Sequence, residues 1–493
     1  MLEKKCKFAC PDEKDILQEN KYWSERRDFD PFPSQRSPYE QDKQRILLST
    51  AFNRMTYKTQ LYVFYETDYR NRLTHTILVD EITSYLATKL GLNVALAQAI
   101  ALGHDIGHAP FGHAGERTLN SILVNLFTDK TLDVDLKKYK LDSFKHNHHA
   151  LTIVQFLAKQ FFCLHPKHLP PDWTYNGLNL TRATKEGILF HTKVSETILR
   201  RDIIYAENVF SDLPNLKKEI DFLEECINLI HVKNDVCGTL EGQLVSEVDE
   251  IAQVYHDLQD GLAERLIEPE EILSSEVIKN AIQRLKRDTT QGEEQELINT
   301  PMNIFELKLM NPTKAKEQFQ IEKSGRFDKV RHWILCTTFK NILTEGLMRF
   351  SQKKIHELEK NFKKGVALEE ILEVNKSDQR QKRYRLKRKI IGFDPETLAV
   401  IQECKKIITE RIYKDPKVVA MDIRGKHILL ELYKIFKANL ELLPEERYQE
   451  YKIMNNGGIL KERFLPIIHH LQGMTDHYAN NLFSKLCGTA IFV

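Results

Sequence analysis

The sequence has no segment that would carry the chain into or across a membrane. No apolar run reaches the ~18 residues that a transmembrane helix needs, and residues 1–14 lack the apolar stretch of a signal peptide. We therefore expect no membrane partner and a cytoplasmic location.

Cysteine and glycine are both scarce. The eight cysteines among 493 residues are scattered and form no Cys-x-x-Cys pair, which predicts reduced thiols rather than a disulfide framework. Only 20 glycines accompany many good helix formers, and this composition favours an all-α fold.

Neither sign of charge is in excess. Lysine and arginine number 72 against 70 aspartates and glutamates, so no overall field draws the chain to nucleic acid or to anionic lipid. One local exception is the run Lys376–Lys389, where basic residues surround Tyr384. Such a run is usually a solvated face, and a phosphate or nucleic-acid contact is the alternative.

A chain of this length is expected to hold more than one domain. Residues 1–40 are polar and contain several prolines, so we expect an irregular arm that ends where Ser37 and Pro38 start a helix. Further along, we expect residues 164–179 to form a loop and Thr289–Pro301 to form a mobile loop.

The densest chemistry lies in the stretch Leu102–Glu116, which holds three histidines, an aspartate and a glutamate. Adjacent His104 and Asp105 can both reach one cation if a helix end aims them at it. Imidazole nitrogen and carboxylate oxygen suit a divalent manganese, iron, nickel, zinc or magnesium ion. Glycines and a proline then break the helix, so we expect the later histidines, His108 and His113, on a loop.

A neighbouring histidine could join this pair. His75 opens a helix that ends near Gly91, and a second helix from Val94 leads to His104. A helical hairpin of this kind could bring His75 beside His104, since facing helices often supply metal ligands. A structural role for His75 is the alternative.

Two further groups of polar residues follow. His113 and Glu116 share a face if a helix restarts at Ala114, which suits a general acid/base pair; a helix cap formed by Glu116 is the alternative. In Lys145–His149 we expect one or two of the histidines to face a cavity and the others to lie at the surface.

Carboxylates also line a later helix. An apolar stripe that includes Leu244, Val248 and Ile251 predicts a helix after Thr239, and Asp249 and Asp257 lie on it two turns apart. Each aspartate is either paired or metal-bound near the core, or part of an exposed acidic face. Similarly, spacing alone predicts that Arg54, Lys58 and Gln60 form a solvated helix end.

Taken in order, these motifs resemble the HD metallohydrolase superfamily, and more narrowly the deoxyguanosinetriphosphate triphosphohydrolase family. The stretches that carry the resemblance are Ala51–Gln60, Arg72–His75, His104–Glu116, Asp249–Ala252 with His256–Leu258, and Gly473–Ala479. The resemblance implies an all-α HD-domain core over residues 41–270, with a C-terminal helical region over residues 271–493 that packs on it.

The resemblance also implies roles for individual residues. A divalent metal ion would be held by His75, His104, Asp105 and Asp249, and His113, steered by Glu116, would serve the chemistry at the α-phosphorus. The residues implied to contact substrate are Arg72 and His108 at phosphates, His146 near the phosphates, Gln60 near the sugar, and Asp257 toward the base or sugar. Gln253 departs from the family, which usually has tyrosine there, so sugar selection is less firmly implied.

The reaction implied is metal-dependent hydrolysis of deoxynucleoside triphosphates, dGTP and other dNTPs, to nucleoside and triphosphate. The alternatives are another HD phosphohydrolase (a nucleotidase or phosphodiesterase) and a protein that binds single-stranded nucleic acid and has a regulatory nucleotide pocket. By resemblance we also expect a homo-oligomer and a nucleotide effector.

Overall fold

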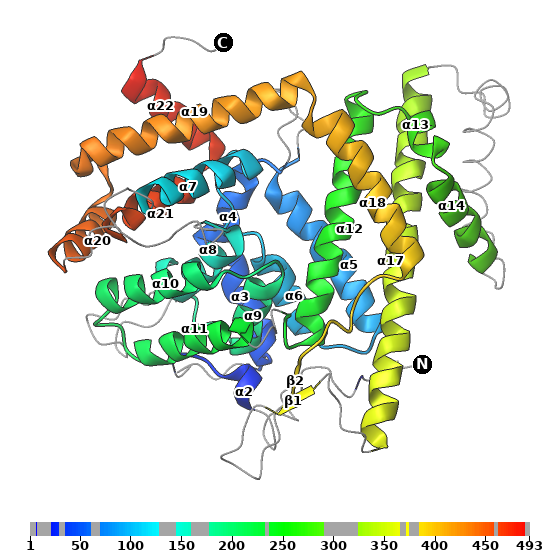
Figure 1. Cartoon of the computed structure of the whole chain (residues 1–493), viewed down its shortest axis with the longest axis horizontal. Coiled ribbons are helices and arrows are strands. Elements are labelled where there is room, and N and C mark those ends of the chain that lie inside the picture. The colour runs from blue at the N-terminus through cyan, green and yellow to red at the C-terminus, as the bar shows by residue number, and fades with distance from the viewer. Residues whose placement is uncertain are drawn as a thin grey trace.

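The chain folds into an all-α structure, as its composition predicts (Figure 1). The computed structural model describes residue 6 and residues 21–28, 35–60, 70–127, 144–158, 177–231, 236–289, 324–364, 371–373, 384–457 and 462–488. Within these residues the only sheet is a two-stranded antiparallel ribbon of β1 (Ile371–Glu373) and β2 (Tyr384–Leu386).

The helices of the first half surround the motifs found in the sequence. Their bounds are α2 Lys21–Ser24, α3 Pro38–Leu47, α4 Thr50–Arg54, α5 Arg72–Lys89, α6 Val94–Gly103, α7 Gly112–Phe127, α8 His146–Thr152, α9 Arg182–Phe190, α10 Glu196–Val209, α11 Leu216–His231, α12 Leu240–Ala263, α13 Pro269–Ser274 and α14 Glu276–Thr289. Short 3-10 and π turns extend them at Met55–Tyr57 and Ile153–Leu157.

The second half contributes longer helices. Their bounds are α17 Ser324–Lys363, α18 Pro395–Ile408, α19 Pro416–Ala438, α20 Glu445–Asn456, α21 Leu465–Gly473 and α22 Asp476–Cys487, with short turns at Thr409–Tyr413, Leu440–Leu442 and Glu462–Phe464.

Side-chain caps start the helices that carry the motifs. Asn71 accepts a hydrogen bond from the Thr74 amide at α5, Asn93 caps α6, and Thr239 caps α12. Each cap satisfies an amide that the helix leaves without a partner. The helix start predicted at Ser37 and Pro38 is confirmed by a capping box.

Helix α12 forms the centre of the larger core. It packs against α5, α6, α9, α17 and α18, and Figure 1 shows it beside α5 with α17 and α18 on its other side. Leu244, Val248, Ile251 and Leu258 of the predicted stripe are fully buried. The aspartates of α12 are therefore held against the helices that carry the histidine motifs.

The C-terminal helices pack on the opposite side of those motifs. Helix α19 lies against α7, α21 and α22, and it crosses above α7 in Figure 1. The apolar side chains between them include Phe111, Leu429 and Leu471, which belong to one buried cluster. The end of the chain is thereby held next to the residues that follow His104 and Asp105.

Some expectations differ from the structure. The arm expected to be irregular contains the one-turn helix α2, with Trp23 and Arg27 buried. Arg385, in the basic run, is fully buried and pairs with Glu186, so it is not part of a solvated or nucleic-acid-binding face. Most of the loop expected at 164–179 and nearly all of Thr289–Pro301 lie outside the described residues.

Two expectations of absence concern the described residues only. None of their helices combines the length and the apolar character that a membrane crossing requires. Six cysteines are described (Cys6, Cys226, Cys237, Cys336, Cys404 and Cys487), and none of these six forms a disulfide bond.

We predict that Leu244→Ala lowers the free energy of unfolding by about 2–5 kcal/mol, because it leaves a cavity where α12 packs on its neighbours. Urea unfolding followed by circular dichroism measures the change. The exposed Leu398 on α18 supplies the control, since Leu398→Ala should change stability by about 0.5 kcal/mol or less. Equal losses in the two variants would contradict a central role for α12.

Candidate active site

Two histidines and an aspartate from three helical segments meet at one point. The Nε2 atom of His75, on α5, lies 2.9 Å from Oδ1 of Asp249 on α12. The Nε2 atom of His104, at the end of α6, lies 3.6 Å from the same oxygen. The ligand atoms of these three residues lie within 4.8 Å of one another, close enough to share a metal ion.

The surroundings of the histidines leave nitrogen lone pairs directed at this point. The Nδ1 atom of His104 donates to the Ala101 carbonyl at 2.6 Å, which fixes the tautomer with a bare Nε2. That Nε2 is buried and makes no hydrogen bond to any described residue. On the other ring, Nδ1 of His75 is 3.1 Å from Nδ1 of His256. A buried nitrogen without a partner fits a metal ligand.

The electrostatics of the site favour a cation. Burial alone would lower the pKa of His104, but the carboxylates of Asp105 and Asp249 raise it to about 9. Burial likewise would raise the pKa of Asp249, yet the neighbouring imidazoles of His104 and His75 hold it well below its usual range. The protein therefore concentrates negative potential where the three side chains meet.

Asp105 faces both this group and its neighbours. One carboxylate oxygen is 3.0 Å from Nε2 of His108 and 3.5 Å from Nε2 of His104, and the other accepts from Arg72 at 2.9 Å. Burial would raise its pKa, but His108, His104 and Arg72 lower it well below the usual range. Asp105 is therefore an ionised carboxylate that borders the group of His75, His104 and Asp249 on one side and pairs with Arg72 on the other.

A second histidine group adjoins the first. The ring of His108 stacks on the ring of His146 with centroids 3.8 Å apart, and Asp105, His108 and His146 form another set of ligand atoms within 4.8 Å. Glu116 lies 3.3 Å from Nδ1 of His146, whose Nε2 is 3.1 Å from Nε2 of His191. Of the histidines at 146, 148 and 149, the last two are buried and not at the surface as expected.

His113 occupies a different position from the one expected. It lies in the first turn of α7 and not on a loop, while His108 lies on the turn between α6 and α7. Glu116 hydrogen-bonds His146, and within the described part of the chain no hydrogen bond joins it to His113. Enclosure by protein atoms and the charge of Arg72 lower the pKa of His113 to about 4, although its ring is open to the pocket.

The pocket beside His113 is lined by residues from distant parts of the chain. Its volume is about 170 Å³, and its walls include Gln60, Arg117 and Tyr413. The amide oxygen of Gln60 is buried there without a hydrogen-bond partner among the described residues. Gln60 is therefore available to a ligand rather than engaged in a solvated helix end.

Arg72 carries unused hydrogen-bond donors. It is 1% exposed, and among the described residues Asp105 engages it through Nη1. Its Nε and Nη2 atoms make no hydrogen bond to any residue that the structure describes. Because unpaired buried donors are costly, these two nitrogens indicate a place for an anionic ligand such as phosphate.

Asp257 lies on α12 two turns beyond Asp249 and is buried. The Tyr413 hydroxyl donates to its carboxylate at 2.5 Å, and Gln253 lies close to the same phenol. Burial raises the pKa of Asp257 to about 7, with a further rise from Asp260 and a partial offset from Tyr413. A hydroxyl and a titrating carboxyl thus stand together beside the pocket.

Sequence reasoning missed three residues of this site. His191 and His256 contact the predicted histidines, and Tyr413 contacts Asp257. His256 could have been found, because it precedes Asp257 on the same helix. Tyr413 has no local signal, since it reaches the site only through the packing of the C-terminal region.

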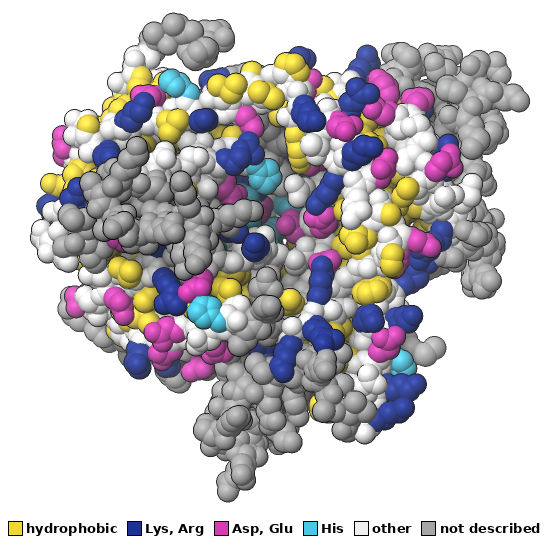
Figure 2. Space-filling model, in the orientation of Figure 1, with side chains coloured by type: hydrophobic (Ala, Val, Ile, Leu, Met, Phe, Trp, Pro, Cys, Tyr) yellow, Lys and Arg dark blue, Asp and Glu magenta, His cyan; other side chains and the backbone are white. Residues whose placement is uncertain are grey.

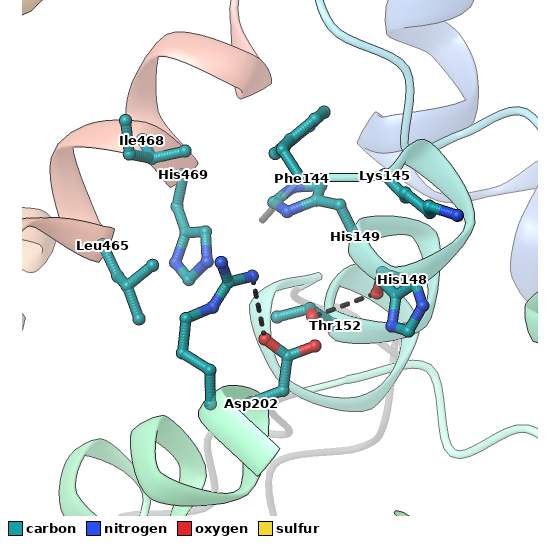
Figure 3. A pocket seen from close by; sticks show the side chains of 10 residues that line it. Phe144, Lys145, His148, His149, Thr152, Asp202, Leu465, Ile468 and His469 are labelled. Atoms are coloured by element: carbon teal, nitrogen blue, oxygen red, sulfur yellow. Dashed lines mark hydrogen bonds and ion pairs between the residues drawn. The ribbon is translucent and has the colours of Figure 1, made fainter. Parts of the chain in front are cut away.

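The surface shows where the site opens. Figure 2 shows a hollow on the face turned toward the viewer, in which histidine and acidic side chains are visible, with basic side chains around it. Another cavity, shown in Figure 3, lies among His148, His149, Asp202 and His469 and measures only about 10 Å³, which is room for a single water. A groove of about 470 Å³ between α14, α17 and α18 is lined, among the described residues, by side chains that include Arg284, Arg349 and Glu396.

Two known domain families match parts of the chain. The HD domain matches residues 72–252, and the phosphohydrolase-associated domain matches residues 391–485. The first span holds His75, His104 and Asp249, and the second holds Tyr413.

Full-length relatives are also found. The chain is 28% identical over 461 residues to a deoxyguanosinetriphosphate triphosphohydrolase-like protein of Rickettsia felis, with 92% of each chain covered. Proteins of the same name from Rickettsia rickettsii and Rickettsia prowazekii are 27% and 28% identical, over 93% and 92% of both chains.

We predict that Asp257→Asn stabilises the fold increasingly as the pH rises. In the unfolded chain the Asp257 carboxyl ionises at about pH 4, whereas in the folded protein it ionises at about pH 7. The free energy of unfolding therefore falls by about 1.4 kcal/mol for each pH unit between pH ~4 and 7. Asparagine does not ionise. At pH 8 the melting temperature of the variant should exceed that of the wild type by about 2 °C or more, and at pH 4 the two should agree. A difference that does not vary with pH would contradict the assignment.

Proposed function

We propose that this chain, which matches the HD domain and the phosphohydrolase-associated domain, is a metal-dependent phosphohydrolase that converts deoxynucleoside triphosphates to nucleoside and triphosphate. The names of its relatives, deoxyguanosinetriphosphate triphosphohydrolase-like proteins, support this choice of substrate class.

The observation that carries the proposal is the position of Arg72. Its Nε and Nη2 atoms, which no described residue engages, are buried next to Asp105, which also borders the group of His75, His104 and Asp249. A phosphate bound to Arg72 would therefore lie against the candidate cation site. Bidentate contact with a phosphate is what a guanidinium fork does best.

The cation site is assigned to His75, His104, Asp105 and Asp249. When bound there, a divalent ion supplies a Lewis acid for phosphoryl oxygens and lowers the pKa of water. The candidate ions are manganese, magnesium, iron, nickel and zinc, all compatible with mixed nitrogen and oxygen ligands.

The phosphates are assigned to Arg72, His108 and His146. Arg72 offsets the negative charge that develops at the reacting phosphoryl group. His108 and His146 are stacked on each other and lie near Glu116, so their rings are held in fixed orientations. Rings positioned in this way need no rearrangement when charge develops.

The proton transfer is assigned to His113. With a pKa of about 4 before substrate binds, His113 is neutral at pH 7. Phosphate charge close to the ring would raise its pKa, which allows His113 to acquire a proton and give it to the departing 5′-oxygen. Glu116 contributes through His146 and through its negative charge near His113.

The nucleoside is assigned to the side of the pocket that holds Gln60, Asp257 and Tyr413. The carboxyl and the phenol form a hydrogen-bonded pair that can bind a sugar hydroxyl. Tyr413 stands against Gln253, the position where the family usually has tyrosine, so an aromatic side chain reaches this region from another part of the chain. In this proposal residues 41–270 form the catalytic core, and residues 271–493 complete the pocket.

We predict that the purified chain with a divalent ion converts at least one of the four dNTPs to deoxynucleoside and inorganic triphosphate. Ion-exchange chromatography of the products distinguishes the reactions, since attack at the α-phosphorus with loss of the 5′-oxygen leaves triphosphate intact. Each dNTP is supplied alone and in mixtures with manganese, magnesium, iron, nickel or zinc.

Other products would decide against the proposal. Monophosphate with pyrophosphate would mean cleavage of a different bond, and hydrolysis restricted to nucleoside monophosphates or cyclic nucleotides would mean another type of HD phosphohydrolase.

The Arg72→Lys variant tests the role assigned to Arg72, because it keeps the positive charge but loses the two-pronged guanidinium. Its kcat/KM should fall by about 10-fold or more.

We predict that His104→Ala removes bound metal and abolishes hydrolysis while helical content is retained, because the site loses a nitrogen with no other task. Metal per chain is measured by plasma mass spectrometry and helicity by circular dichroism. His231, which is exposed on α11, supplies the control: His231→Ala should keep both metal and activity. Full metal content in His104→Ala would refute the ligand assignment.

A further inference from the structure

The C-terminal helices reach the turn between α6 and α7, which connects Asp105 to His113. The side-chain amide of Gln472, on α21, donates to the Gly107 carbonyl. The Lys58 ammonium donates to the His108 carbonyl at 2.5 Å and to the Gln472 carbonyl at 2.9 Å. Gln472 and Lys58 are both buried, so water does not compete for these bonds.

Asp476, the first residue of α22, makes the remaining contacts. Its Oδ1 atom accepts from the Phe111 amide at 2.9 Å. Its Oδ2 atom accepts from the Thr59 amide at 3.0 Å and from the Thr59 hydroxyl at 2.5 Å. One carboxylate near the end of the chain therefore joins two segments that lie 365 and 417 residues before it.

The turn held in this way has an unfavourable backbone. Phe111 has φ of 62°, in the left-handed region that a bulky residue rarely adopts, and Gly112 follows with φ of 55°. A strained residue of this kind is costly and persists only where its surroundings hold it. A Cβ on Gly425 of α19 would lie 2.8 Å from the Phe111 Cβ, so the phenyl ring is also packed tightly.

The same contacts extend to Arg72. The Arg72 amide donates to the Lys58 carbonyl at 2.9 Å, and Thr59 forms an isolated bridge with Asn71. Residues 58–60 thus connect the start of α5, with its phosphate-facing arginine, to the turn that leads to His113.

We propose that Lys58, Gln472 and Asp476 are positioning residues through which the phosphohydrolase-associated domain sets the backbone of residues 107–112, and with it His113 and Arg72. For the activity readout this inference rests on the proposed function. It gives the associated domain a task in catalysis: it holds the strained turn from which the proton-transferring histidine projects.

A purely stabilising role fits these residues less well. Taking an ammonium and a carboxylate out of water is costly, and apolar side chains of similar size often stabilise a core better. The hydrogen bonds of Lys58 and Asp476 go almost entirely to the backbone of the turn and of residues 59 and 472. Their geometry constrains the position of main-chain atoms, which is what placement of His113 requires.

The first test uses hydrogen exchange of the full-length protein, which does not depend on substrate. In Asp476→Ala the Phe111 amide loses its acceptor, so a peptide that spans residues 105–115 should exchange about 10-fold faster or more than in the wild type. Asp476→Asn keeps one acceptor oxygen and should show a smaller increase. Exchange in α12 should be unchanged in both variants.

The second test compares rate constants. Asp476→Ala should lower kcat by about 10- to 100-fold with little change in KM, because a displaced histidine impairs the transition state more than binding. Thr59→Val, which lacks the hydroxyl, should show a partial loss, and Thr59→Ser, which retains both donors, should restore wild-type kcat.

The matched control is Glu450→Gln. Glu450 accepts from Tyr205 and pairs with Arg447, so the change weakens the C-terminal region without touching residues 107–112. It should lower the melting temperature but leave kcat and exchange of residues 105–115 at wild-type values.

Unchanged exchange of the 105–115 peptide in both Asp476→Ala and Gln472→Met would overturn the proposal, whatever the activity. Should Asp476→Ala fail to fold, Gln472→Met and Thr59→Val carry the same test. If the wild type hydrolyses no dNTP, the proposed substrate is wrong, and the exchange measurement still decides whether the associated domain holds the turn.

Discussion

The buried carboxylate of Asp105 is the constraint on which the rest of the site depends. It balances the Arg72 guanidinium on one side and contacts the rings of His104 and His108 on the other. A carboxylate so deeply buried is tolerated only when it is paired and hydrogen-bonded. The start of α5, the end of α6 and the following turn are consequently held at fixed distances by one charge, and loss of any partner would leave the others uncompensated.

Three carboxylates, those of Asp105, Glu116 and Asp249, lie among histidines in this enclosed region. Their combined potential attracts a cation and, taken alone, would repel a triphosphate. On the proposed function, the bound cation and Arg72 together reverse this balance. Several donors and ring nitrogens in this region have no hydrogen-bond partner among the described residues. In the folded protein such groups are costly unless a ligand satisfies them.

Helix positions and several candidate residues could be predicted from the sequence, because caps and apolar periodicity are local signals. Asn71, Asn93 and Thr239 each start a helix where the pattern begins, and the stripe on α12 is buried as its spacing predicts. Contacts between side chains could be predicted less well from the sequence. Glu116 shares a helix face with His113 but binds His146 instead, because α8 packs close enough to offer its imidazole. The roles of the site residues as metal or substrate ligands remain predictions.

By itself the sequence determined the all-helical architecture and the approximate positions of the motif-bearing helices, since each depends on neighbours within a few turns, and it named the candidate metal ligands. The tertiary structure alone decided that Tyr413 stands beside Asp257, that Arg385 is buried, and that Asp476 holds the turn before His113. These contacts join residues more than 100 positions apart. Their geometry follows from how whole helices pack, and no local pattern encodes it.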